Sequence, residues 1–191
     1  MSRRCYVPHF EHVDLPNIQS CFFDGRSHRA YLKIPFAGDR GKEKLCVIGQ
    51  NPSAADEFKA DKTIRYLEKL ICLKHFQYRQ LIVLNLYSQV DTTKTEQTNP
   101  LHPKCEELFN RILEEEANFL VVFGKLTNQG QYCFLDRVRQ IEPLLRYKRV
   151  SKLNLDTQYA PHPGNPKILY NNFNVDFSPY SFADIGISNS S

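Results

Sequence analysis

The sequence predicts an α/β fold: a single domain of three layers, in which helices cover both faces of a central, mostly parallel sheet of four strands. Three runs are apolar throughout, at residues 45–48, 81–84 and 119–123, and residues 149–155 predict a fourth strand. Continuous apolar runs are typical of strands that are buried on both faces. Segments with apolar residues at helical spacing lie between the runs, and such alternation favours a parallel sheet.

Three of the intervening segments predict helices. The first begins near Asp61, whose side chain we expect to cap the helix. The apolar residues with helical spacing are Ile64, Leu67, Leu70 and Ile71, then Leu108, Ile112 and Leu113 (with an end near Ala117), then Leu135, Val138 and Ile141. The single domain, residues 1–191, therefore has its core at about 44–170. Residues 1–43 predict a β-rich extension, with aromatic stretches at 21–23 and 31–34, and the last few residues are expected to be disordered.

Composition restricts the class of protein. The formal charge of +4 and the isoelectric point near 8.7 permit a nucleic-acid partner without requiring one. The six cysteines include no Cys-x-x-Cys pair, which argues against a zinc or iron–sulfur site. There is no signal peptide and no apolar segment of membrane length. We therefore expect a cytoplasmic monomer with reduced thiols, no metal, no cofactor and no membrane partner.

Polar residues follow the apolar runs, and in a parallel sheet these strand ends share one edge, where ligands bind. The segments in question are Gly49-Gln50-Asn51-Pro52-Ser53, Asn85-Leu86-Tyr87-Ser88, Gly124-Lys125 and Pro161-His162-Pro163-Gly164. The first segment alone is also compatible with a simple turn, because Gly, Asn, Pro and Ser all form turns. Taken together, the amide and imidazole side chains can hydrogen-bond a planar heterocycle.

These motifs resemble those of the uracil-DNA glycosylase superfamily. Gly49-Gln50-Asn51-Pro52 is similar to its first loop, Asn85 to its base-reading asparagine, and His162-Pro163-Gly164 to its late histidine loop. Residues 51–56 (Asn-Pro-Ser-Ala-Ala-Asp), Asp61-Lys62-Thr63-Ile64-Arg65 and Asn85-Leu86-Tyr87 more closely resemble an uncharacterised bacterial and phage branch. The resemblance covers about residues 44–170 and implies a uracil-DNA glycosylase-like fold.

The resemblance implies a monofunctional DNA N-glycosylase, which flips a base out of DNA and hydrolyses its glycosidic bond. His162 would stabilise the departing base, and Asn51 would position water, because an amide cannot take a proton. Asp56 would then be the base, whereas Asp61 is better explained as a helix cap. Gln50, Ser53, Asn85 and Tyr87 would bind the flipped base. The backbone of the DNA would be held by Lys125, Gly164, Arg146, Lys148 and Arg149.

Ser53 stands where uracil-specific relatives carry a bulky aromatic residue that excludes a substituent at C5 of the base. The sequence therefore predicts a pyrimidine enlarged at C5, such as hydroxymethylated or glucosylated cytosine of phage DNA, and hence a role in anti-phage defence. Three alternatives remain open: a repair glycosylase for uracil or thymine mismatches, a catalytically silent nucleic-acid-binding module, and an enzyme of nucleotides or nucleosides. For the last, no Gly-rich phosphate loop is present.

Overall fold

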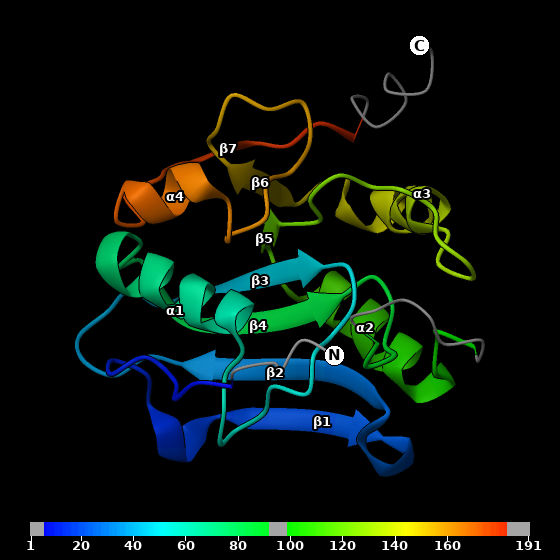
Figure 1. Ribbon diagram of the computed structural model, residues 1–191, viewed down its shortest axis with the longest axis horizontal. Coiled ribbons are helices and arrows are strands. Elements are labelled where there is room, and N and C mark those ends of the chain that lie inside the picture. The colour runs from blue at the N-terminus through cyan, green and yellow to red at the C-terminus, as the bar shows by residue number, and fades with distance from the viewer. Residues whose placement is uncertain (1–5, 92–98, 183–191) are drawn as a thin grey trace.

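The computed structural model describes residues 6–91 and 99–182, and its described part contains one mixed sheet of seven strands and four α-helices (Figure 1). The strand order across the sheet is β1-β2-β4-β3-β5-β6-β7. The strands are β1 (Gln19–Phe23), β2 (His28–Pro35), β3 (Glu43–Gly49), β4 (Tyr78–Asn85), β5 (Asn118–Val121), β6 (Arg149–Leu153) and β7 (Phe177–Pro179). Short 3-10 helices span Leu15–Asn17 and Asp24–Arg26.

The predicted α/β class is confirmed, but the predicted number of strands is wrong. β4, β3, β5 and β6 pair in parallel and correspond to the four predicted strands, although β5 ends at Val121 and β6 at Leu153. β1 and β2 extend one edge of the same sheet as antiparallel strands, and β7 extends the other. β1 and β7 are only partly buried, so their sequences lack the continuous apolar character of a central strand. The stretches at 21–23 and 31–34 are confirmed as strands, and they belong to the sheet rather than to a separate extension.

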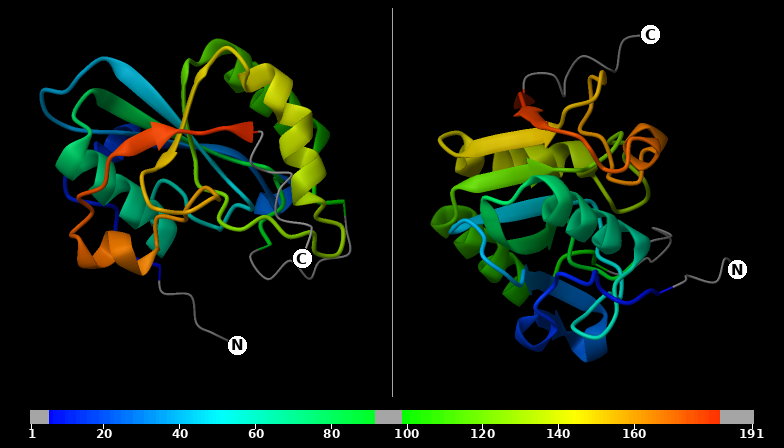
Figure 2. Two further views of the ribbon diagram at one scale, coloured as in Figure 1. Left: turned by 90° about the horizontal axis from the view of Figure 1, so that it is seen from above. Right: turned by 90° about the vertical axis from the view of Figure 1, so that its left-hand side faces the viewer.

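Helices cover both faces of the sheet (Figure 2). On one face α1 (Lys62–Lys74) and α4 (Pro166–Tyr170) bury residues such as Leu67 and Ile168 against Val47 of β3. On the other face α2 (Pro103–Glu115) and α3 (Phe134–Leu145) pack Phe109 and Val138 in a second apolar cluster. Consecutive strand residues point to opposite faces, so β3 contributes Val47 to the first cluster and Ile48 to the second.

The helix boundaries follow local chemistry. Asp61 caps α1 as predicted, because its Oδ1 accepts a hydrogen bond from the backbone N–H of Ile64 at 2.8 Å. α2 begins at Pro103, upstream of the apolar residues that marked it in the sequence; proline is favoured in the first turn, where its missing N–H costs nothing. The expected disorder of the final residues lies outside the described ranges.

Two further features concern the class of protein. Within residues 6–91 and 99–182, no helix is both apolar enough and long enough to pass through a bilayer. In the same ranges, no three His, Cys, Asp or Glu side chains are grouped so as to hold a metal ion. Cys46 and Cys72 are buried, and burial raises the pKa of the Cys72 thiol to about 11.

Candidate functional site

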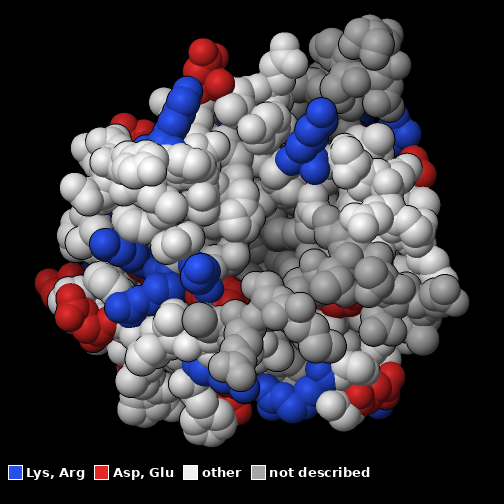
Figure 3. Space-filling view, in the orientation of Figure 1, with Lys and Arg blue, Asp and Glu red and all other residues white. Residues whose placement is uncertain are grey.

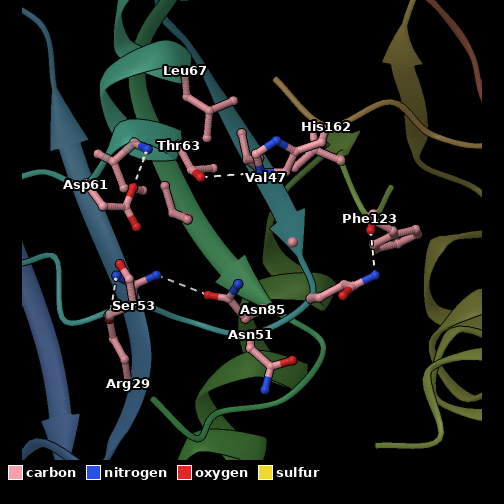
Figure 4. A pocket seen from close by; sticks show the side chains of 15 residues that line it. Arg29, Val47, Asn51, Ser53, Asp61, Thr63, Leu67, Asn85, Phe123 and His162 are labelled. Carbon is pink, nitrogen blue, oxygen red and sulfur yellow. Dashed lines mark hydrogen bonds between the residues drawn. The ribbon is translucent and has the colours of Figure 1, made fainter. Parts of the chain in front are cut away.

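A pocket of about 220 Å³ lies at the carboxyl ends of β3, β4 and β5, where the amino end of α1 faces them (Figure 4). Its walls combine apolar strand residues with polar loop residues. Five of the residues predicted for a base-binding site line it: Gln50, Asn51, Ser53, Asn85 and His162. Three polar residues not assigned to the site from sequence also line it, namely Arg29, Asp61 and Thr63.

The loop after β3 is fastened to both neighbouring strands. The carbonyl of Gly49 accepts the N–H of Leu86 at 2.9 Å, and the Gln50 side-chain amide donates to the carbonyl of Phe123 at 2.7 Å. A Cβ atom on Gly49 would lie 3.0 Å from the Nδ2 atom of Asn85. Glycine at this position therefore lets the Asn85 amide approach the loop closely.

Asn51 has an unsatisfied side chain. Both its Oδ1 and its Nδ2 are buried, and neither has a hydrogen-bond partner among the described residues. A buried amide without a partner costs about 1–3 kcal/mol, and native proteins nearly always pair such groups. The Asn51 amide is therefore suited to a water or ligand that binds in the pocket.

Arg29 and Asn85 form a buried pair on the opposite side of the pocket from His162 (Figure 4). Arg29 Nη2 donates to Asn85 Oδ1 at 3.1 Å, and Nη1 donates to the carbonyls of Ala55 at 3.1 Å and Ser53 at 3.4 Å. Burial lowers the pKa of Arg29 to about 10, which leaves the guanidinium protonated at neutral pH. The site thus contains a buried positive charge.

His162 lies at the mouth of the pocket, in a loop that a bridge between Ala160 and Gly124 fastens to the end of β5. Its Nδ1 accepts the backbone N–H of Gly164 at 3.0 Å, and its Nε2 lies 3.3 Å from Thr63 Oγ1. Desolvation lowers the pKa of His162, with partial opposition from the negative charge of Asp61. The ring is therefore neutral at pH 7, and because Nδ1 accepts, the proton lies on Nε2.

Asp61 lines the pocket and Asp56 does not, which reverses the roles that the sequence suggested for them. Asp56 does not line the pocket; it forms an ion pair with Arg26 at 2.6 Å and accepts the backbone N–H groups of Phe58 and Lys59. The prediction of Asp56 as the base is therefore corrected, since its carboxylate is engaged elsewhere. Asp61 is the carboxylate that lines the pocket, in addition to its role as a cap.

Tyr87 is also removed from the base-binding set. It is 5 % exposed, and its ring packs edge-on against Tyr132 and Phe134 at 5.1 and 5.3 Å between centroids. It belongs to the apolar cluster on the α3 face of the sheet. A tyrosine near a strand end can pack either in the core or against a ligand, and Tyr87 packs in the core.

The basic residues predicted to hold DNA fall into two separate groups. Lys125 and Gly164 line a depression of about 300 Å³ that shares His162 with the pocket. Arg146, Lys148 and Arg149 instead lie at the amino end of β6, where Arg149 pairs with the first residue of β5. β3 has seven residues, so this edge is about 20 Å from the pocket, and these three residues are not part of the site.

The charges on the face shown in Figure 3 do not form one basic band. Lys and Arg side chains occur there in separate groups, with uncharged surface between them. On this face, charge alone does not define a binding track for a polyanion.

Arg29 and Thr63 were missed because their signals are weak. Arg29 occurs in a basic stretch with Arg26 and His28, which the sequence presents as surface charge. Only the pairing of β2 with β4 brings Arg29 to Asn85. Thr63 is in the first turn of α1, and the sequence presents it as part of the Asp61-Lys62-Thr63-Ile64-Arg65 helix start rather than as a site residue.

A sequence model of the family described as "Protein of unknown function (DUF1643)" matches residues 30–164. All residues that line the pocket fall in this range except Arg29, which immediately precedes it. Neither the curated proteins nor the solved structures give a match.

Proposed function

The chain belongs to the family described as a protein of unknown function, DUF1643, and we propose that this member is a DNA glycosylase with a uracil-DNA glycosylase-like fold. It would flip a pyrimidine into the pocket and hydrolyse its N-glycosidic bond, which leaves an abasic site. The observation that carries the proposal is a neutral His162, with its proton on Nε2, at a pocket also lined by Asn85 and by Asn51, whose amide has no partner among the described residues.

Breakage of the glycosidic bond sends its electron pair to the base, which leaves as an anion. A neutral imidazole is a suitable donor to such an oxygen, because it stabilises the developing charge without protonating the base prematurely. His162 Nε2 would donate to the carbonyl next to the scissile nitrogen. The buried charge of Arg29 would add electrostatic stabilisation in a site of low dielectric constant.

Water must reach the anomeric carbon as the base departs and lose a proton. Asn51 would hold this water with an amide that has no other partner among the described residues. Asp61 would favour the positively charged sugar and accept the proton, since its carboxylate lines the same pocket. Asp56 has no part in this step.

The proposed substrate class is a pyrimidine enlarged at C5. Ser53 is 6 % exposed and lines the pocket, and its hydroxyl accepts the backbone N–H of Ala55. The side chain at this wall is therefore small and is bound to its own loop. A hydroxymethylated or glycosylated base would find room at this wall. Such bases occur in phage DNA, and defence against phages is the corresponding biological role.

The test is incubation with duplexes that carry uracil, a thymine mismatch or a C5-modified pyrimidine, followed by alkaline cleavage of abasic sites. We expect strand breaks with a modified base, and their loss in His162→Ala and Asn51→Ala. Tyr147→Ala is the control, because Tyr147 is 91 % exposed and does not line the pocket. Absence of breaks with every duplex, from a folded protein that binds DNA, would rule out the glycosylase.

A second candidate is a nucleic-acid-binding module without catalysis. It is favoured by the ion pair of Asp56 with Arg26, which removes the expected carboxylate, and by an amide at position 51. In that case His162→Ala and Asn51→Ala would retain DNA binding, and no base would be released by the unsubstituted protein.

A further inference from the structure

The orientation of the Asn85 amide is determined by its neighbour. A guanidinium group has only hydrogen-bond donors, so the atom of Asn85 that faces Arg29 must be the carbonyl oxygen. The amide nitrogen is then directed away from Arg29 and into the pocket (Figure 4). An asparagine with free rotation could present either group to a ligand; here one of the two is already taken.

Arg29 is itself firmly held. It is 3 % exposed, and two backbone carbonyls of the loop after β3, those of Ser53 and Ala55, accept from its Nη1. Gly49 adds a second constraint, because the Asn85 nitrogen lies 3.0 Å from the position that a Cβ atom would take there. Asn85 is therefore fixed from two sides, and a turned amide would set its N–H groups against those of Arg29.

We propose that Arg29 is a specificity-determining residue: by engaging Asn85 Oδ1, it makes Asn85 a hydrogen-bond donor to the ligand. The pocket then selects a base that presents a keto oxygen to Asn85 and rejects one that presents an amino group. This inference rests on the proposed function and narrows its substrate class. If His162 donates to the O2 oxygen, Asn85 meets the far edge of the ring, and the preferred substrates are 4-keto pyrimidines of the uracil type rather than 4-amino pyrimidines of the cytosine type.

A purely structural role for Arg29 makes a different prediction. If Arg29 only fastened the loop to the sheet, its replacement would reduce activity on all bases equally and would not change their ratio. Selection by hydrogen bonding changes the ratio, because an amino group opposite the Asn85 nitrogen leaves both donors unpaired.

The experiment compares 5-hydroxymethyluracil with 5-hydroxymethylcytosine at one position of the same duplex, by single-turnover base release. We expect the uracil-type base to be released at least about tenfold faster. In Asn85→Asp, one carboxylate oxygen still accepts from Arg29 and the other replaces the donor, so the preference should reverse. Arg29→Gln should bring the two rates to within about threefold, while Arg29→Lys, which keeps a donor, should retain the preference of the unsubstituted protein.

Folding of each variant is checked by its melting temperature, and Asn85→Asp is nearly isosteric, so it remains informative if Arg29→Gln does not fold. Equal release of the two bases by the unsubstituted protein, or an unchanged ratio in Asn85→Asp, would overturn the assignment of Arg29. If no duplex releases a base, the glycosylase fails, and the specificity is tested separately by thermal shift with free uracil and free cytosine. Stabilisation by uracil alone, reversed in Asn85→Asp, supports the assignment; equal or absent shifts overturn it.

Discussion

The backbone N–H of Gly164 donates to Nδ1 of His162 at 3.0 Å, and this contact decides which ring nitrogen carries the proton. With Nδ1 occupied as an acceptor, the neutral ring has its proton on Nε2, beside Thr63 and the pocket. Gly164 is therefore a positioning residue for His162, whereas the sequence suggested a contact with DNA.

The first prediction concerns the pKa of His162. Desolvation lowers it below its ordinary value of 6.5, while Asp61 raises it. We expect the NMR titration of the imidazole to have its midpoint below pH 6.5. Base release should decline only as the pH falls through that midpoint, because the neutral ring is the donor in the proposed mechanism. Asp61→Asn removes the charge that favours the protonated ring, so the midpoint should move to lower pH. A shift to higher pH would contradict the assigned electrostatics.

The second prediction concerns the cap of α1. Asp61→Ala removes the acceptor of the Ile64 N–H and should lower the free energy of unfolding by about 1 kcal/mol. Asp61→Asn retains a good capping side chain and should cost much less. Chemical denaturation measures both variants, and an equal loss in the two would show that capping is not the cause.

The third prediction concerns Gly49. In Gly49→Ala the new methyl group would lie 3.0 Å from Asn85 Nδ2 and displace the amide. Base release should fall by about tenfold or more, because the displaced Asn85 amide is no longer placed to hydrogen-bond the base. The double variant with Asn85→Ala should be no slower than Asn85→Ala alone, because the methyl group then has nothing to displace. If the losses of the two single variants add in the double variant, Gly49 does not act through Asn85.

The fourth prediction compares two exposed basic residues. Lys125 borders the depression next to His162, whereas Arg146 lies at the opposite edge of the sheet. Lys125→Ala should weaken DNA binding and reduce the slope of log affinity against log salt by about one. Arg146→Ala should leave both unchanged. Fluorescence anisotropy over a salt series tests the two variants. Weaker binding in Arg146→Ala, with no change in Lys125→Ala, would show that DNA binds at the amino edge of the sheet.

The fifth prediction concerns a buried ion pair outside the site. His9 Nδ1 contacts Glu68 Oε1 of α1, and the second carboxylate oxygen accepts the N–H of Phe10 at 2.9 Å. Burial alone would lower the pKa of His9, but the hydrogen bond and the charge of Glu68 outweigh it and raise that pKa.

Because the pKa of His9 is raised on folding, the pair stabilises the protein fully below pH 6.5, and this contribution is lost as the pH rises through the raised value. Glu68→Ala should therefore cost about 3 kcal/mol at pH 6 and less at higher pH. Unfolding free energies measured across this range check it. A cost that grew with pH would contradict the assigned charge state.

The sequence was sufficient for those parts of the fold that depend on local pattern. The continuous apolar runs at 45–48 and 81–84 are buried on both faces, and Asp61 caps α1 as its chemistry suggests. β7 could not be predicted, because its three residues have no period of their own and pair only through β6.

The site follows the same division. Gln50, Asn51, Asn85 and His162 could be brought together from sequence, because each follows a strand or a strand-end loop and parallel strands share an edge. Asp56 could not be placed, since its ion pair with Arg26 depends on tertiary contacts. Arg29 could not be found for the same reason: the register of β2 against β4 decides its partner.

The position of Arg29 in β2 also determines how the molecule can be divided. The four parallel strands, with the loop of Asn51 and the loop of His162, look like a self-sufficient unit, yet the residue that orients Asn85 comes from an antiparallel neighbour. A fragment that begins at β3 would keep most of the reactive groups and lose the selectivity. For the proposed glycosylase, grafts and truncations must therefore include β2, and new base preferences are best sought by changing residues 29 and 85 together.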